Sequence, residues 1–463
     1  MNKLHRKVTL IMSGILIASA ISGCGGTKQG DNGVKTVTIW SGNTHMKTVV
    51  EPLINNWNNN EGKEKGIFID YQFKDGGTIT QAIDTALQSG EAPDMFSTGN
   101  VRKLSETGNI LAIEDLPGGK EYIEQYCDKK FFVEGKNIYK GKTYGLPICA
   151  GPQGLIYNKD MFKKAGLVDE NGEPTPPETW DEVREYAKIL TNASEKRYGI
   201  ILPMKWTGWF NSDVIHAGLA SVGHMGFDPI EGKYDYSGFA PIADCLLGMK
   251  ADGSVYPGSE TIDNDPARAL FASGVVGMKL AYCFDVGVLN DQFPAECDWG
   301  VAPYPVLDKD NKYMQRMTYS NTMRINSKAL DTVGGDAMME VVKLFTSDWW
   351  IKEMYKGGVD LPHDSKYIEG VELGDSAKKG WTDFADLLDI SAQEPREPMK
   401  EMGDALTLQD KFINEVWSGE KSSAQMFEEY SEQTNEGVAT YYKNHPEESL
   451  DEYINKDWNI KRD

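Results

Sequence analysis

Two tryptophans stand within four residues of each other in the segment KWTGWFN, at positions 205–211, with polar side chains around them. Flat indole rings stack on the apolar faces of a ligand, and short polar side chains exchange hydrogen bonds with hydroxyl groups. The segment therefore predicts a ligand pocket to which Trp206, Trp209 and Asn211 contribute. The alternative is that one of the two rings packs in the core.

A second group of this kind follows an apolar run at 275–280, which predicts a buried strand. Tyr282, Phe284 and Asp285 come directly after it and combine two rings with a carboxylate. We expect them to contribute to the same pocket if the two segments lie at the same edge of a sheet.

Polar side chains also follow three strand-like segments near the beginning of the chain. Asn43, Thr44 and His45 follow the first, Asp75 the second and Thr98 the third. Ligands of parallel sheets bind beyond the carboxyl ends of the strands, so these residues are candidate contacts. Asp75 begins an Asp-Gly-Gly sequence that is equally typical of a turn, and a loop histidine is more often simply solvated.

Alternating strands and helices must position these loops. Strand-like runs at 37–40, 67–73 and 94–96 are separated by apolar residues at helical spacing over about 46–57 and 79–87. Pro52 predicts that the first helix begins near it, and Gly90 predicts the end of the second. This order is typical of a mainly parallel sheet covered by helices.

The alternation resumes near residue 150. A strand is expected at 154–157 and a helix at 158–165, and Thr179 with Glu182 predicts a capping box before the next helix. Ser422 and Gln425 predict a second capping box near the C-terminus. Four further tryptophans are expected in the core because they share helix faces with apolar residues or end a helix: Trp57, Trp180, Trp349 and Trp417.

The N-terminal residues predict export and a membrane anchor. Three basic residues precede an apolar run at 8–20 that is too short to span a bilayer, which is typical of a secretory signal over 1–23. The sequence ISGC at 21–24 resembles the bacterial lipoprotein box, which implies lipid on the Cys24 thiol. Residues 24–34 would be a flexible tether. An ordinary signal peptide that happens to contain a cysteine is the alternative.

Composition limits the partners and the number of domains. The formal net charge of −22 argues against nucleic acid as a partner. About 430 residues follow the tether, which is too many for a single hydrophobic core and predicts two lobes or domains. The remaining cysteines have no metal-ligand spacing, so buried thiols are expected and neither metal nor cofactor is implied. These cysteines are Cys127, Cys149, Cys245, Cys283 and Cys297.

Several stretches, in their order along the chain, resemble the extracellular solute-binding proteins of carbohydrate ABC transporters, the group that includes the maltose-binding protein. These are VTIW, GEAPDMF, YGLP followed by GLIYNKDMFKKAGL, PETWDEVREYAKILT, ALFASGVVGMKLAYCFDVG and the closing LQDKFINEVWSGEKSSAQMFEEYSEQTNEGV. Together they cover nearly all of the chain after the tether.

The resemblance implies a two-lobed periplasmic-binding-protein-like α/β fold (class II) that closes about a hinge. Lobe one would take 35–148 and 320–361, and lobe two 152–318 and 365–463. The chain would cross between the lobes near 147–154, 319–326 and 359–363.

It also implies a sugar or oligosaccharide as ligand and delivery to permease subunits driven by a cytoplasmic ATPase. The protein would be a monomer held by lipid at the outer face of a membrane, with a Gram-positive-like cell surface expected. In this family the segment at 205–211 offers a stacking ring and the loop at 43–45 offers polar contacts. The sequence Tyr-Cys-Phe at 282–284 departs from the family's Gly-x-Trp, which leaves open which ring stacks.

Two other functions stay open at this stage. A secreted glycoside hydrolase would also be acidic and rich in aromatic residues, and its two carboxylates need no local motif. A binder of a polyamine would combine aromatic rings with carboxylates such as Asp75 and Asp285.

Overall fold

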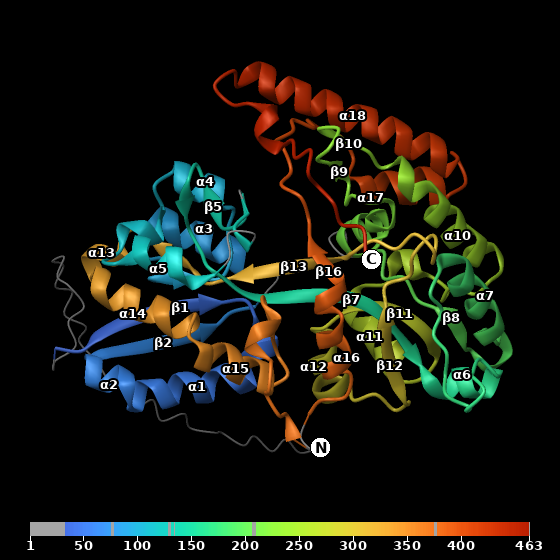
Figure 1. Ribbon diagram of the computed structural model, residues 1–463, viewed down its shortest axis with the longest axis horizontal. Helices are drawn as coiled ribbons and strands as arrows, with labels where there is room; N and C mark the ends of the chain where they lie inside the picture. Colours follow the sequence, from blue (N-terminus) through green and yellow to red (C-terminus); the bar gives the residue numbers. More distant parts are fainter. Residues whose placement is uncertain are drawn as a thin grey trace, which may run out of the picture.

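The computed structural model describes residues 33–75, 78–127, 131–133, 135–205, 210–374 and 377–462. Its chain forms two α/β lobes side by side, each built on its own sheet (Figure 1). Among the described residues no helix combines the length and the apolar character needed to cross a bilayer. The mixed α/β fold with two sheets confirms the predicted fold class.

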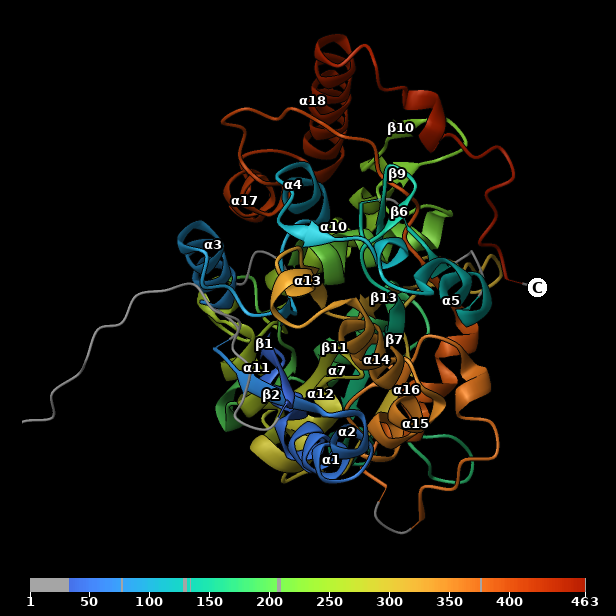
Figure 2. The same ribbon diagram turned by 90° about the vertical axis from the view of Figure 1, so that its left-hand side faces the viewer.

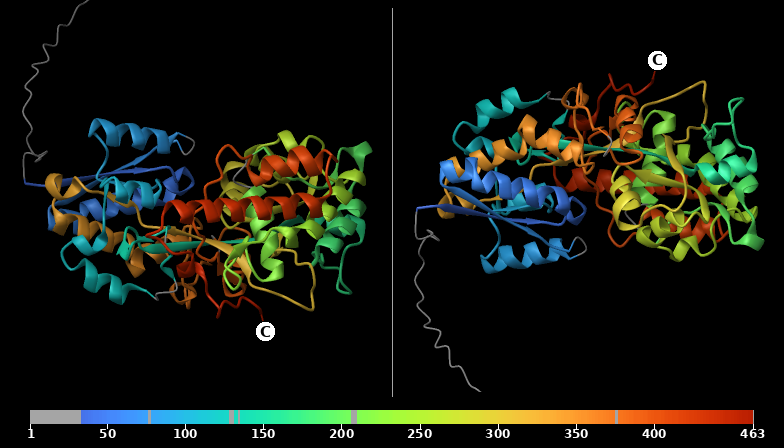
Figure 3. Two further views of the ribbon diagram at one scale, coloured as in Figure 1. Left: turned by 90° about the horizontal axis from the view of Figure 1, so that it is seen from above. Right: turned by 90° about the horizontal axis from the view of Figure 1, so that it is seen from below.

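The first sheet has five strands in the order β2-β1-β3-β14-β4, and with its helices it forms lobe one. Parallel pairing of β1 with β2 and with β3 confirms the predicted βαβαβ unit. The strands are β1 Lys35–Ser41, β2 Ile67–Phe73, β3 Met95–Phe96, β4 Ile110–Leu111 and β14 Arg324–Asn326. Helices α1 and α3 lie on opposite faces of this sheet (Figure 3).

The helices of lobe one come from two distant parts of the chain. Those of the first part are α1 Lys47–Asn59, α2 Glu61–Lys65, α3 Ile79–Ser89, α4 Val101–Glu106 and α5 Gly119–Tyr126. Those of the second part are α13 Ala329–Thr332, α14 Gly335–Phe345 and α15 Asp348–Lys356. Val341 and Phe345 of α14 share one apolar core with Val37 and Ile39 of β1, so the second part completes the first.

The second sheet contains seven strands and, with its helices, forms lobe two. Its main order is β16-β13-β7-β11-β8, and β12 and β15 also pair with β7. The strands are β7 Pro147–Asn158, β8 Tyr198–Ile200, β11 Val276–Tyr282, β12 Trp299–Pro303, β13 Gln315–Asn321, β15 Leu361–Pro362 and β16 Ser391–Gln393. Two-stranded ribbons pair β5 Ile138–Tyr139 with β6 Lys142–Thr143 and β9 Phe227–Asp228 with β10 Lys233–Tyr234.

The main helices of lobe two surround this sheet, and the longest, α18, runs along one side of the molecule above both lobes (Figure 1). They are α6 Lys159–Ala165, α7 Trp180–Leu190, α10 Ala240–Ala251, α11 Asn264–Ala272, α12 Asp285–Gly287, α16 Trp381–Asp386, α17 Leu408–Lys411 and α18 Ser423–Asn444.

We call β7, β13 and β15 the crossing strands. Figures 1 and 2 show β7 and β13 running between the two lobes, and the short β15 pairs with β7 at Cys149 and Ala150. β7 and β15 overlap the predicted crossing segments at 147–154 and 359–363, whereas β13 shares only 319–321 with the segment predicted at 319–326. The residue boundaries proposed for the two lobes stay a prediction.

Helix ends follow the predicted local chemistry closely. Thr179 and Glu182 form the reciprocal capping box, and Gly90 ends α3 in the left-handed conformation with φ of 78°. At Ser422 one half of the second box is present, since its hydroxyl accepts from the Gln425 amide. The prediction from Pro52 was wrong: α1 begins at Lys47 and carries the proline inside it.

The core position predicted for Trp349 was also wrong. The helix ends at Phe345, and Ser347 caps a new helix by accepting from the Trp350 amide at 3.1 Å. This break shifts the helical phase, so Trp350 is buried with 4% exposed while Trp349 is 39% exposed. The core positions predicted for Trp57, Trp180 and Trp417 are confirmed.

Candidate ligand-binding site

The crossing strands present one row of side chains toward the space between the lobes. Thr318 pairs with Gly151, and Tyr282 of β11 pairs with Gln153 of β7. Directly opposed residues of antiparallel strands lie on the same face, and alternate residues lie on opposite faces. Thr318 and Arg316 therefore share one face of β13, which we call the cleft face, and Met317 and Tyr319 belong to the other.

A buried polar network fixes Tyr282 at the lobe-two end of the cleft face. Its hydroxyl donates to Asp213 Oδ1 at 2.9 Å and accepts from Arg316 Nη1 at 2.6 Å. Burial raises the pKa of Asp213 to about 7 although Arg316 opposes the shift. The tyrosine ring is thus held by two groups, which leaves its orientation independent of any ligand.

Arg316 also connects the two lobes through Glu394. Its Nε donates to Glu394 Oε1 at 2.5 Å, and Lys136 of lobe one reaches Glu394 Oε2 at 2.7 Å. Burial opposes ionisation of Glu394, but the charges of Arg316 and Lys136 hold its pKa well below the usual range. The carboxylate therefore stays charged and ties the lobes together beside the cleft face.

A cavity of about 250 Å³ lies at the lobe-one end of the same face. Asn43, Ser97, Cys149, Ser320 and Asp360 supply its polar lining, and side chains of α1, α14 and α15 supply the apolar part. Asp360 is 5% exposed, and its Oδ1 has no hydrogen-bond partner in the described part of the chain. Burial raises its pKa to about 7.

His45 and Phe284 meet where the two lobes touch. Their ring centroids are 5.7 Å apart, and both line a small cavity of about 100 Å³ together with Thr44. Burial, with smaller contributions from Arg268 and Lys378, lowers the pKa of His45 to about 4, so the ring is neutral at neutral pH. The predicted residues Thr44, His45 and Phe284 are thus brought together from both lobes.

Asp285 has a structural role in this arrangement. It is 2% exposed, forms ion pairs with Arg268 and with the fully buried Lys279, and accepts from the Tyr282 amide at 3.2 Å. Buried charges of this kind must be compensated. The carboxylate neutralises two cations and positions Tyr282, and it lines none of the cavities described here.

The other predicted contacts are more dispersed. Asp75 is exposed and accepts from the Thr78 amide and hydroxyl, each at 3.1 Å, as expected of a turn. The Thr98 hydroxyl lies 3.2 Å from that of Thr80. Asn211 is half-buried in the helical turn Phe210–His216. Trp206, Trp209 and Cys24 lie outside the described residues.

Cys149, Cys245 and Cys283 are buried free thiols, as predicted, whereas Cys127 and Cys297 are only half-buried. In the described ranges one group of side chains, His445, Glu447 and Glu448, lies close enough together to share a metal ion. Glu448 already pairs with Arg102 and with the Tyr441 hydroxyl. This surface group therefore does not indicate a metal centre.

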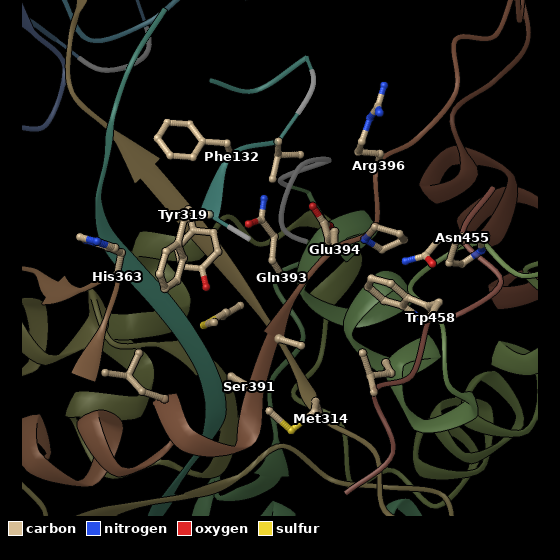
Figure 4. Close-up of a pocket in the computed structure, with 18 of the residues that line it drawn as sticks. Phe132, Met314, Tyr319, His363, Ser391, Gln393, Glu394, Arg396, Asn455 and Trp458 are labelled. Atoms are coloured by element: carbon tan, nitrogen blue, oxygen red, sulfur yellow. The ribbon is translucent and has the colours of Figure 1, made fainter. Parts of the chain in front are cut away.

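The largest cavity described here, about 680 Å³, lies on the other face of the crossing strands (Figure 4). We call it the rear cavity. Tyr319 and Met317 of β13 form its base, and Phe132, Gln393 and Trp458 are among its walls. No sequence pattern predicted it, because its lining comes from six separate segments that are not individually distinctive.

A family model supplies the observation that decides the class of protein. The model described as bacterial extracellular solute-binding protein matches residues 42–347. The chain belongs to this family. The hydrolase alternative is thereby overturned, because the family consists of binding proteins and not of enzymes.

Individual relatives of this solute-binding protein are distant. The maltotriose-binding protein of Pyrococcus abyssi is 26% identical over 286 residues, which cover 60% of this chain and 56% of that one. The sn-glycerol-3-phosphate-binding periplasmic protein of Brucella abortus is 27% identical over 288 residues, covering 58% and 61%. The GacH receptor of Streptomyces glaucescens, whose structure was solved unliganded and in complex with acarbose, superposes with a TM-score of 0.65 at 18% identity. The match covers 89% of this chain and 98% of that one, and this likeness concerns the fold.

Proposed function

We propose that this solute-binding protein captures a sugar or oligosaccharide in the cleft between its lobes and delivers it to an ABC permease. The observation that carries the proposal is the cleft face itself, where Tyr282 and Phe284 stand beside Gln153 and Thr318. Rings next to short polar side chains suit the apolar faces and hydroxyls of a sugar. Relatives named for maltotriose and for arabinooligosaccharides support this ligand class.

Closure of the lobes would report that the ligand is bound. Both lobes contribute to the cleft, from Asn43 and His45 on one side to Tyr282 and Phe284 on the other. A ligand that contacts both sides favours the closed state by its differential affinity, and a permease can recognise that state. We propose Trp206, Trp209 and Asn211 as further contacts, and Thr44 and Thr98 at the rim.

The two carboxylates that would bind a polyamine, Asp75 and Asp285, do not support that alternative. A polyamine needs uncompensated negative charge, whereas Asp285 is neutralised by Arg268 and Lys279. Asp75 is an exposed turn residue. We therefore retain a neutral sugar as the ligand class.

We further propose that lipid on Cys24 holds the protein at the outer face of a membrane. The tether at 24–34 would keep the binding lobes near the permease at high effective concentration. The signal-like segment at 1–23 and the ISGC sequence support this location.

A ligand screen tests the proposed function directly. The purified protein is heated with mono- and oligosaccharides, including maltotriose and arabino-oligosaccharides, with spermidine and glycerol 3-phosphate as competitors from other classes. A ligand at about 1,000 times its Kd stabilises the native state by about 4 kcal/mol, which raises Tm clearly. A shift with spermidine or glycerol 3-phosphate, and with no sugar, would reject the proposal.

A further inference from the structure

The rear cavity opens on the face of β13 that carries Met317 and Tyr319, whereas the cleft face carries Arg316 and Thr318. Tyr319 also lines the cavity of about 250 Å³, so the two cavities adjoin at this ring. A volume of about 680 Å³ falls in the range of pockets that hold small organic ligands. Ligand binding in the cleft does not account for a second pocket of this size.

Aromatic rings surround the rear cavity and are held in place by the protein. The Trp458 indole N–H donates to the Gly223 carbonyl at 3.0 Å, which fixes the ring. Tyr453 is covered by the Arg396 guanidinium at 4.7 Å from its centroid, and Tyr319 packs edge-on against Phe131 at 5.4 Å. Rings that are fixed before binding lose little conformational entropy when a flat ligand stacks on them.

Polar side chains alternate with these rings. Figure 4 shows Gln393 and Glu394 between Tyr319 on one side and Trp458 on the other, with Asn455 next to Trp458. Glu394 is already paired with Arg316 and Lys136. Because this charge is compensated, the cavity favours a neutral ligand with hydrogen-bonding groups.

Three lining residues carry buried polar atoms without a hydrogen-bond partner in the described ranges. These atoms are Gln393 Oε1, His363 Nε2 and Arg396 Nε. The Nδ1 atom of His363 faces the Ile148 carbonyl at 3.3 Å and must donate to it, so Nε2 of the neutral ring is an acceptor. A buried polar group without a partner destabilises the folded protein, so a ligand that bonds it gains affinity.

Two acceptors and one donor are best satisfied by hydroxyl groups, because a hydroxyl both donates and accepts. A carboxylate ligand cannot donate to Gln393 Oε1 or His363 Nε2. A simple cation cannot accept from Arg396. The three atoms are buried in this structure, so contact with a bound polyol requires these side chains to rotate toward the cavity.

We propose that the rear cavity is a second binding site, for a neutral saccharide or similar cyclic polyol, and that it is distinct from the cleft. The rings of Trp458 and Tyr319 would stack on the ligand, and Gln393 and Asn455 would bond its hydroxyls. The proposal does not depend on which solute occupies the cleft.

The indole signals of the eleven tryptophans in a ¹⁵N NMR spectrum provide a test at the level of one residue. The Trp458 signal is assigned by its loss in Trp458→Phe. The protein is titrated with glucose, galactose, xylose, arabinose and maltose, each to a large excess. We expect at least one sugar to shift the Trp458 signal, while the signal of the exposed Trp349 stays in place.

Two variants separate the rear cavity from the cleft. Gln393→Met keeps the size of the side chain but removes its amide acceptor. It should lower the affinity for the sugar that shifts the Trp458 signal by about tenfold, which is about 1.4 kcal/mol. Phe284→Ala changes the cleft and should leave the Trp458 titration unchanged. Circular dichroism and Tm confirm that both variants are folded.

Three results would overturn the proposal. The Trp458 signal does not move with any of the five sugars, or it titrates identically in Gln393→Met, or its shift disappears in Phe284→Ala. The last result would mean that Trp458 reports closure of the cleft and not a ligand of its own. If the ligand screen finds no sugar that binds the cleft, the Trp458 titrations still test the rear cavity independently.

Discussion

The rings of His45 in lobe one and Phe284 in lobe two lie 5.7 Å apart, centroid to centroid, across the junction of the lobes. Phe284 also covers Gly151 of the crossing strand β7, where an added Cβ would lie 2.9 Å from its ring. One side chain therefore contacts both the opposite lobe and the floor of the cleft. Its removal should affect ligand binding more than folding.

We expect Phe284→Ala to weaken sugar binding by about tenfold, because a stacking pair contributes about 0.5–1.5 kcal/mol beyond its buried area. Phe284→Tyr, which keeps the ring, should bind nearly as the wild type does. Isothermal titration with the sugar found by the screen measures both. Equal loss in the two variants would show that the ring itself is not the contact.

Trp206 and Trp209 give a second prediction for the cleft. Replacement of at least one of them by alanine should lower sugar affinity by about tenfold or more, since a stacked aromatic ring is lost. Trp349→Ala serves as the control, because this tryptophan is 39% exposed and belongs to α15. Unchanged affinity in both Trp206→Ala and Trp209→Ala would remove the segment from the site.

An ion pair between α4 of lobe one and the segment after α18 of lobe two predicts an effect on ligand release. Arg102 of α4 lies 3.3 Å from Glu448, beyond the end of α18, and its guanidinium covers the Tyr441 ring. Exposed pairs contribute up to about 1 kcal/mol, so Glu448→Gln should raise the dissociation rate of the sugar by up to about fivefold.

The neighbouring Glu447 provides a matched control for this ion pair. Glu447 lies beside His445 of the same lobe, so Glu447→Gln should leave the dissociation rate unchanged in stopped-flow measurements. The difference between the two variants should also shrink at high salt, because salt screens exposed charges. If both variants release the sugar at the same rate, Arg102–Glu448 does not hold the lobes together.

Asp360 predicts a specific pH dependence of stability. Its pKa in the folded protein is about 7, above the usual 3.8, so the folded state retains a proton that the unfolded state loses. The associated stability is fully present below about pH 4 and is lost as the pH rises to about 7. Asp360→Asn mimics the protonated carboxyl group, so its stability should not decrease over this pH range.

The free energy of unfolding in urea, measured from about pH 4 to about pH 8, checks this. As the pH rises from about 4 to about 7, the free energy of unfolding of Asp360→Asn should increase relative to that of the wild type. The increase should reach up to about 1.4 kcal/mol per pH unit. His45 contributes with the opposite sign in both proteins, because its pKa is lowered to about 4, and it therefore cancels from the difference. A difference that does not vary with pH would refute the assignment.

The lipid anchor is tested by Cys24→Ser. This variant should not incorporate labelled palmitate and should appear in the culture medium instead of the membrane fraction. Cys297→Ser, which changes a half-buried thiol, should behave as the wild type does. Membrane retention of Cys24→Ser would indicate another mode of attachment.

Local patterns predicted much of the fold. The capping box at Thr179, the helix end at Gly90 and the parallel βαβαβ unit depend on neighbouring residues, and all three are confirmed. Trp349 and Trp350 could not be distinguished from periodicity alone, because the helix break at Ser347 decides which one is buried. Pro52 likewise did not mark the start of its helix, since α1 begins five residues earlier at Lys47 and buries Val50, Ile54 and Trp57.

The site was predictable only in part, because side-chain roles depend on distant partners. The sequence placed Asn43, His45 and Phe284 in loops that do meet between the lobes. It could not show that Asp285 is neutralised by Arg268 and Lys279, or that Tyr282 is held by Asp213 and Arg316. The rear cavity, with walls from six segments, had no sequence pattern at all.

The completion of lobe one by α14 and β14 has a consequence for the order of folding. Strand β14 inserts between β3 and β4, and α14 fills the core behind β1, yet both follow more than 280 residues after β1 begins. Pairings this far apart in the chain form slowly, because a large loop must close before they stabilise anything. Lobe one therefore reaches its native state only after most of the polypeptide has been synthesised. A chain that must pass through a membrane in extended form has time to do so before it becomes compact.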